Sequence, residues 1–163
     1  MSPSKAFARV IGGAALVALS FGGPPSLAQS AGPFAGLAGT WTGGGTVSLA
    51  SGASERIRCR ATYAGGGNAL QMNLRCASDS YNFNLTSNVQ ANGNAIAGSW
   101  TETTRNASGS VSGTASGGQI QARVSGPTFT ANLAVAMRGN SQSIGIRSAG
   151  TELTGVNISL SRR

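Results

Sequence analysis

Apolar and polar residues alternate along nearly the whole chain after residue 40, and this pattern restricts the folds open to it. The segment LQMNLRC, residues 70–76, has apolar side chains at even positions and polar ones at odd positions. Successive side chains of a β-strand point to opposite faces, so such a segment has one apolar and one polar face. The chain shows no helical period, and the pattern therefore predicts an all-β protein.

Short Gly- and Asn-rich segments separate the alternating runs. They are GGGN (65–68), ANGN (91–94), SGGQ (116–119), SGP (125–127), RGN (138–140) and SAG (148–150). Gly and Asn tolerate a positive φ, so tight hairpins form readily there. A sandwich or a barrel would hide the apolar faces, and closure into a barrel would also remove exposed edges. We expect an antiparallel up-and-down β-barrel of eight to ten strands; a β-solenoid is the alternative, but no fixed repeat period supports it.

The first 28 residues have the features of a cleavable signal peptide. Lys5 and Arg9 precede the apolar run VIGGAALVALSF, residues 10–21, which is too short to span a membrane comfortably. The small-residue site SLA, residues 26–28, follows it, and an uncleaved anchor is the alternative. We expect a signal peptide at 1–28, a flexible lead-in at 29–36 and one barrel domain at 37–163. The protein would then be secreted or periplasmic, exported by a bacterium.

Two cysteines, Cys59 and Cys76, fit an exported chain that carries one disulfide. Both have inward parity in two alternating runs that the turn at 65–68 connects. We therefore expect them to lie opposite each other on adjacent antiparallel strands. Closing this loop would contribute on the order of 3 kcal/mol in the chain-entropy model.

Both tryptophans occur in a Gly-x-Trp setting, in LAGTWT (37–42) and IAGSWT (96–101). Glycine lets a strand bend sharply near the rim of a small barrel. The Trp two residues later can then cover the end of the core. We expect two such corners, at Gly39–Trp41 and at Gly98–Trp100.

The motif GTW at residues 39–41 opens the first predicted strand, and in this setting it resembles the lipocalins and the wider calycin superfamily. It is also similar to the opening strand of avidin-like barrels. The calycin resemblance implies that an Arg near the chain end packs over the first Trp, here Arg162 over Trp41. The chain departs from both groups: no helical segment precedes its last strand, and Trp100 is the only later Trp, so biotin binding is not implied.

The chain also resembles the bacterial inhibitor of metalloproteases, a small secreted barrel with a Gly-x-Trp strand and one disulfide. That resemblance implies a free N-terminal arm that reaches into the protease. The lead-in QSAGPFAG, residues 29–36, would be this arm. A disordered linker is the alternative, because chain ends are often loose.

Groups that carry common catalytic chemistry are missing. The chain has no His, which removes the usual general base and the commonest metal ligand. After cleavage it has no Lys for a Schiff base, and a disulfide leaves no thiolate. The four acids are scattered and form no glycosidase-like pair, while the Gly-rich stretches precede strands instead of a helix. We expect no enzymatic activity, no metal and no cofactor.

Inward aromatic residues form the candidate ligand site, and they could line a cup for a small apolar or aromatic molecule. Ordinary core packing is the alternative. Glu102 has inward parity beyond Trp100, where it could orient a polar group of the ligand or pair with an Arg at the rim. The candidates are Trp41, Tyr63, Tyr81, Phe83, Trp100, Glu102 and Phe129.

Arg56, Arg58, Arg60 and Arg75 form the candidate anion site, on the outward face of neighbouring strands. The predicted cysteine register places Arg60 opposite Arg75, an unfavourable pair, and Arg56 opposite Asp79, a favourable one. This row could bind an anionic glycan or lipid surface; a solvated exterior is the alternative. No aromatic residue interleaves the row, which disfavours nucleic acid. The polar outer face also lacks the apolar band of a membrane-inserted barrel.

Two hypotheses of function follow. The first is an exported β-barrel that binds a small apolar or aromatic ligand in its interior. The second is a non-catalytic interaction module of the cell envelope, either a protease inhibitor or a binder of anionic surfaces. The formal net charge of +8, which loss of Lys5 and Arg9 would lower to +6, is compatible with an acidic partner.

Overall fold

The computed structural model describes residues 31–163, and these form a closed barrel of ten antiparallel strands. Each strand pairs with its neighbours in sequence, and β1 also pairs with β10 to close the barrel. The predicted all-β, up-and-down barrel is confirmed, with the strand number at the upper limit. The strands are β1 (Gly39–Leu49), β2 (Ser54–Gly66), β3 (Ala69–Ala77), β4 (Asn82–Asn92), β5 (Ala95–Glu102), β6 (Ala107–Ser116), β7 (Gln119–Ser125), β8 (Thr130–Arg138), β9 (Ser141–Ser148) and β10 (Leu153–Arg162).

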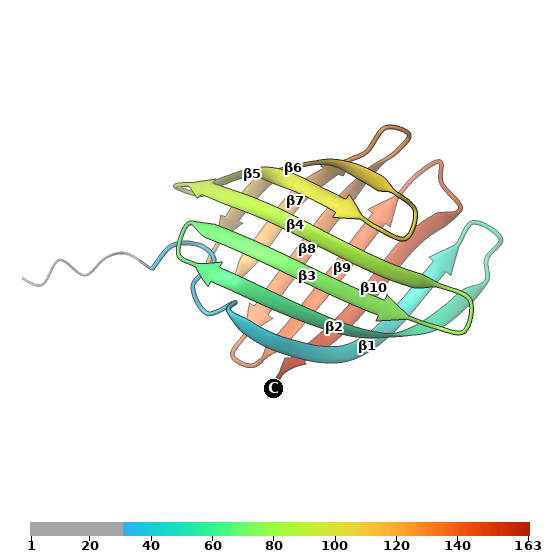
Figure 1. Ribbon diagram of the computed structural model, residues 1–163, viewed down its shortest axis with the longest axis horizontal. Helices are drawn as coiled ribbons and strands as arrows, with labels where there is room; N and C mark the ends of the chain where they lie inside the picture. The colour runs from blue at the N-terminus through green and yellow to red at the C-terminus, as the bar shows by residue number, and fades with distance from the viewer. Residues whose placement is uncertain (1–30) are drawn as a thin grey trace, which may run out of the picture.

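The barrel is flattened, with β1–β5 in one wall and β6–β10 crossing behind it (Figure 1). Its two ends differ in their connections. At one end, four tight turns join the strands at residues 67–68, 93–94, 117–118 and 139–140, and each contains a Gly with positive φ. At the other end, called the mouth here, five longer loops join them at residues 50–53, 78–81, 103–106, 126–129 and 149–152. The predicted Gly-rich segments fall in these turns and loops.

Residues 31–38 enter the barrel at the end of the tight turns, called the plugged end here. The Phe34 amide donates a hydrogen bond to Gly67 O, and the side chains of Phe34 and Leu37 are fully buried. Beside them Trp41 is 0% exposed, and its indole N–H donates to Leu37 O at 2.8 Å. Within the described part of the expected lead-in, residues 31–36, Phe34 therefore packs into the core, while Ala31, Ala35 and Gly36 are exposed. The expected signal peptide at 1–28 lies outside the described residues.

The predicted register of β2 and β3 is confirmed: Cys59 lies opposite Cys76, and a disulfide joins them. Arg60 lies opposite Arg75, as expected. The expected pairing of Arg56 with Asp79 is wrong, because the ladder ends two positions earlier, where Arg58 pairs with Ala77. The chain turns into the loop at 78–81 at that point.

The two Gly-x-Trp motifs require their glycines for different physical reasons. Gly39 has a φ of 121°, a conformation that other residues rarely adopt, so this glycine does permit a bend. Gly98 has no such φ; a Cβ at this position would lie 2.0 Å from Asn88 O on β4. The second motif therefore reflects the close approach of two strands, and the prediction of two equivalent corners is wrong.

Candidate ligand site at the barrel mouth

Five of the seven predicted ligand residues lie at the mouth, and two lie at the plugged end. The strand order decides this division, because β3–β4, β5–β6 and β7–β8 all turn at the mouth. Beside the five lies Arg105, from the loop at 103–106. We call these six residues the mouth cluster: Tyr81, Phe83, Trp100, Glu102, Arg105 and Phe129.

Trp100 and Phe129 form one half of the mouth cluster. Their ring centroids are 5.6 Å apart with an interplanar angle of 48°. The Trp100 indole N–H donates to Ser125 O on β7 at 3.2 Å, and a Cβ at Gly109 on the intervening β6 would lie 2.8 Å from Nε1. The indole thus lies across β6, where only a glycine leaves room for it. Trp100 is buried, whereas Phe129 beside it remains partly exposed.

Tyr81 and Phe83 form the other half. Their rings are stacked, with centroids 6.3 Å apart, and both residues are partly exposed. The Arg105 guanidinium lies over the Phe83 ring, with its carbon 4.8 Å from the ring centroid. A hydrogen bond from Arg105 Nη1 to Asn82 O at 3.1 Å fixes the guanidinium there. A cation over an aromatic face is attracted by the ring quadrupole, so Arg105 holds Phe83 in place.

Glu102 joins the loop at 103–106 to the neighbouring strand. Its carboxylate accepts backbone hydrogen bonds from Asn84 at 3.0 Å, Thr104 at 3.1 Å and Arg105 at 2.7 Å. Burial raises the pKa of this carboxyl, but the hydrogen bonds, from Thr104 first and then from Asn84 and Arg105, outweigh it and hold the pKa below its ordinary value. Both carboxylate oxygens are engaged by the protein itself. Of the two roles expected for Glu102, the structure supports the one at the rim, with Arg105 Nη1 at 3.9 Å.

Tyr63 lies at the plugged end, near Trp41. Its hydroxyl donates to Gln142 Oε1 at 3.0 Å, and burial raises its pKa to about 12, against a small opposing effect of this bond. Gln142 is 3% exposed, and its Nε2 has no hydrogen-bond partner within the described residues. A buried amide nitrogen without an acceptor costs folding free energy.

The four predicted anion-binding arginines lie on the outer wall, on the face opposite the aromatic residues. All four side chains are exposed, and three of them line a hollow of about 530 Å³. A second hollow of similar volume, over β7–β10 and β1, is lined by uncharged residues. Within residues 31–163, no three His, Cys, Asp or Glu side chains lie close enough to share a metal ion. In this same range, no helix has the length and apolar character needed to cross a membrane.

Solved structures with a similar fold include that of Rv2717c from M. tuberculosis. It superposes with a TM-score of 0.61 at 16% sequence identity, over 78% of this chain and 92% of that chain. The S-type phycobiliprotein lyase CPES from Guillardia theta superposes with a TM-score of 0.52 at 10% identity, over 77% of this chain and 88% of that chain. These likenesses concern the fold. No protein-family model and no curated protein sequence matches the chain.

Sequence reasoning missed two buried residues, Gln142 and Phe34, and one exposed residue at the rim, Arg105. Gln142 shares the inward parity of Ile144 and Ile146, so the alternation alone would have found it. Arg105 follows Glu102 by three residues, and in a turn this spacing is only a weak indication of an ion pair. Phe34 stands outside any alternating run, and nothing in the sequence distinguishes it from a loose terminal residue.

Proposed function

We propose that this protein is an exported, non-catalytic carrier that binds a small apolar or aromatic ligand at the mouth of the barrel. The observation that carries the proposal is the grouping of Tyr81, Phe83 and Phe129, three partly exposed aromatic residues, around one end of a closed barrel. Apolar pockets with a few fixed polar groups are the usual sites for such ligands.

The contrast between the two ends supports this location. At the plugged end Phe34, Leu37 and Trp41 are at most 1% exposed. The partly buried apolar residues are concentrated toward the mouth, where they include Leu49, Phe83, Leu85, Val124, Phe129, Leu133, Ile146 and Leu153. Burying this surface against a ligand would be favourable by about 25 cal/mol per Å².

Export and a binding role each have support of their own. The disulfide between Cys59 and Cys76 is compatible with an oxidising compartment. A fold shared with a phycobiliprotein lyase is compatible with ligand binding. The absence of His from the sequence favours binding over catalysis.

A fluorescence titration with N-phenyl-1-naphthylamine, a neutral apolar probe, tests the proposal. The wild type should bind it, and Phe83→Ala and Phe129→Ala should each weaken binding by about tenfold or more, because each removes a large apolar contact. Thr86→Ala is the matched control, since Thr86 lies on β4 but is exposed on the outer wall. Circular dichroism must show that all variants keep the β fold. A wild type that does not bind the probe, or mouth variants that bind it as tightly as Thr86→Ala, would contradict the proposal.

A further inference from the structure

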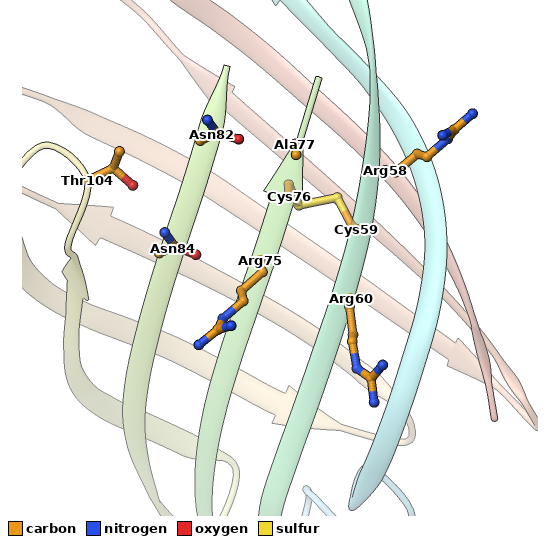
Figure 2. A pocket seen from close by; sticks show the side chains of 9 residues that line it. All are labelled: Arg58, Cys59, Arg60, Arg75, Cys76, Ala77, Asn82, Asn84 and Thr104. Carbon is orange, nitrogen blue, oxygen red and sulfur yellow. A yellow bond between two sulfur atoms is a disulfide. The ribbon is translucent and has the colours of Figure 1, made fainter. Parts of the chain in front are cut away.

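A hollow on the outer wall brings basic and amide side chains from three neighbouring strands together. It has a volume of about 530 Å³ and lies over β2, β3 and β4, with the loop at 103–106 at its edge. Its polar side chains are those of Arg58, Arg60, Arg75, Asn82, Asn84 and Thr104 (Figure 2). Its strand residues point away from the barrel interior. At its edge, Asn82 O accepts a hydrogen bond from Arg105, and the Thr104 amide donates one to Glu102, both in the mouth cluster.

Two positively charged residues occupy opposite positions in the ladder beneath this hollow, with their side chains extending in different directions (Figure 2). Arg60 and Arg75 lie directly opposite in the β2–β3 ladder, and their neighbours along the same row are Thr42 and Asn84, which are both uncharged. Like charges at directly opposed positions destabilise an antiparallel pair. Among residues 31–163, the ion pair within 4.0 Å is that between Arg105 and Glu102, so neither Arg60 nor Arg75 has a carboxylate partner there. The positive charges of Arg60 and Arg75 are therefore not neutralised by another side chain among residues 31–163.

The disulfide holds this unfavourable pair together. Cys59 and Cys76 occupy the register position next to Arg60 and Arg75, and their Cα atoms are 4.1 Å apart. A covalent bond at this position prevents the two strands from separating under the repulsion. The spacing of the two strands that carry Arg60 and Arg75 is thus fixed before any ligand arrives, and a preformed backbone lowers the cost of binding.

The donors suit an anion with several terminal oxygens. A guanidinium presents N–H groups in a planar fork that matches two oxygens of one anion. A carboxylate has only two oxygens and is satisfied by a single fork. A phosphate or sulfate monoester has three terminal oxygens, so it can bridge two guanidinium groups and still accept a bond from an amide. Figure 2 shows Arg75 extending toward the strand that carries Asn84, and Arg58 pointing away from Arg60 and Arg75.

We propose that the hollow between β2 and β4 binds a phosphate or sulfate group, bridged by Arg60 and Arg75 with Asn84 as a further donor. Arg163 extends the positive field along the row, because its Nε donates to Thr42 Oγ1 at 2.9 Å and Thr42 pairs with Arg60. The ligand lies on the outer wall, so the larger molecule that carries the group remains in solvent. This site is independent of the proposed ligand at the mouth.

Isothermal titration with inorganic phosphate, with chloride at equal ionic strength as the reference, tests the site. Arg60→Gln and Arg75→Gln should each lower phosphate affinity by about tenfold or more, the loss expected when a charge-assisted hydrogen-bond pair is removed. Arg123→Gln is the matched control: Arg123 is also exposed, lies on β7 in the other wall, and its loss changes the net charge equally. No phosphate binding by the wild type, or an equal loss in Arg123→Gln, would overturn the proposal.

Thermal unfolding provides a second readout that a folding defect cannot imitate. Without phosphate, Arg60→Gln and Arg75→Gln should unfold at the same temperature as the wild type or higher, because each removes one of two repelling charges. Phosphate should raise the unfolding temperature of the wild type and of Arg123→Gln but not of these two variants. Variants that unfold earlier than the wild type, yet still respond to phosphate, would count against a bridged anion.

The source of the anion is decided by two further probes, a sulfated disaccharide and vesicles that contain phosphatidic acid, whose phosphomonoester also has three terminal oxygens. Capture of the disaccharide alone would indicate a glycan, and capture of the vesicles alone would indicate a lipid headgroup. In either case the capture must be lost in Arg60→Gln and kept in Arg123→Gln. Capture that Arg60→Gln leaves unchanged would overturn the site.

Discussion

Arg162 and Trp41 show how single residues seal the barrel. They lie opposite each other in the β1–β10 ladder, and the guanidinium carbon is 4.5 Å from the centroid of the indole ring. Arg162 also donates hydrogen bonds to Ala38 O and Gly36 O, so it ties the last strand to the segment that precedes the first. The contact expected from the calycin resemblance is therefore present. It combines a cation–π interaction with backbone anchoring.

Tyr63 offers a spectroscopic test of the plugged end. Its raised pKa of about 12 means that the neutral form is favoured by folding. The corresponding stability is complete below pH 10 and is lost as the pH rises toward 12. In an alkaline titration followed by tyrosinate absorbance, one tyrosine should ionise only near pH 12, and Tyr63→Phe should remove that late phase. A late phase that persists in Tyr63→Phe would contradict the buried assignment.

At the scale of elements, the β2–β3 hairpin could be predicted from the sequence. The alternation placed Ile57, Cys59, Ala61 and Tyr63 on one face of β2, and all four are buried there. The cysteine parity also gave the β2–β3 register. The parity of the residues does not show where a ladder ends. The predicted pairing of Arg56 with Asp79 therefore lies beyond the last pair of this hairpin, Arg58 with Ala77.

The hydrogen bonds between Glu102 and the loop at 103–106 should make the free energy of unfolding depend on pH in acid. Glu102→Gln should lower the free energy of unfolding at neutral pH by about 1–2 kcal/mol, because a carboxylate that accepts several hydrogen bonds becomes a neutral amide. The pKa of Glu102 is lowered by folding, so its contribution is present above its ordinary value of 4.5 and is lost as the pH falls through the folded pKa. Urea unfolding at neutral pH and well below pH 4.5 should therefore show a difference that disappears in acid. An equal difference at both pH values would refute this role.

At the scale of the whole molecule, closure depends on contacts between the two ends of the sequence. The pairing of β1 with β10 leaves no exposed strand edge within residues 31–163. Alternation predicts apolar faces that must be hidden, but it does not say which strands close the barrel. It also did not distinguish the plugged end from the mouth, because this difference depends on Phe34 and Leu37, which precede the first strand. For the same reason, Trp41 and Tyr63 were grouped with mouth residues from which the barrel separates them.

Phe34 provides the last test, because it decides whether the N-terminal segment is part of the core. Phe34→Ala should lower the free energy of unfolding by about 3–5 kcal/mol, the usual cost of removing a fully buried phenyl ring. Ala35→Ser is the matched control, since Ala35 is exposed and its substitution should change stability by less than about 0.5 kcal/mol. Urea unfolding followed by tryptophan fluorescence measures both, since Trp41 is hydrogen-bonded to Leu37 O in the same segment. If both variants are as stable as the wild type, the segment does not seal the barrel and is available as the free arm that an inhibitor would need. A large loss confined to Phe34→Ala would mean that such an arm could form only by opening the core.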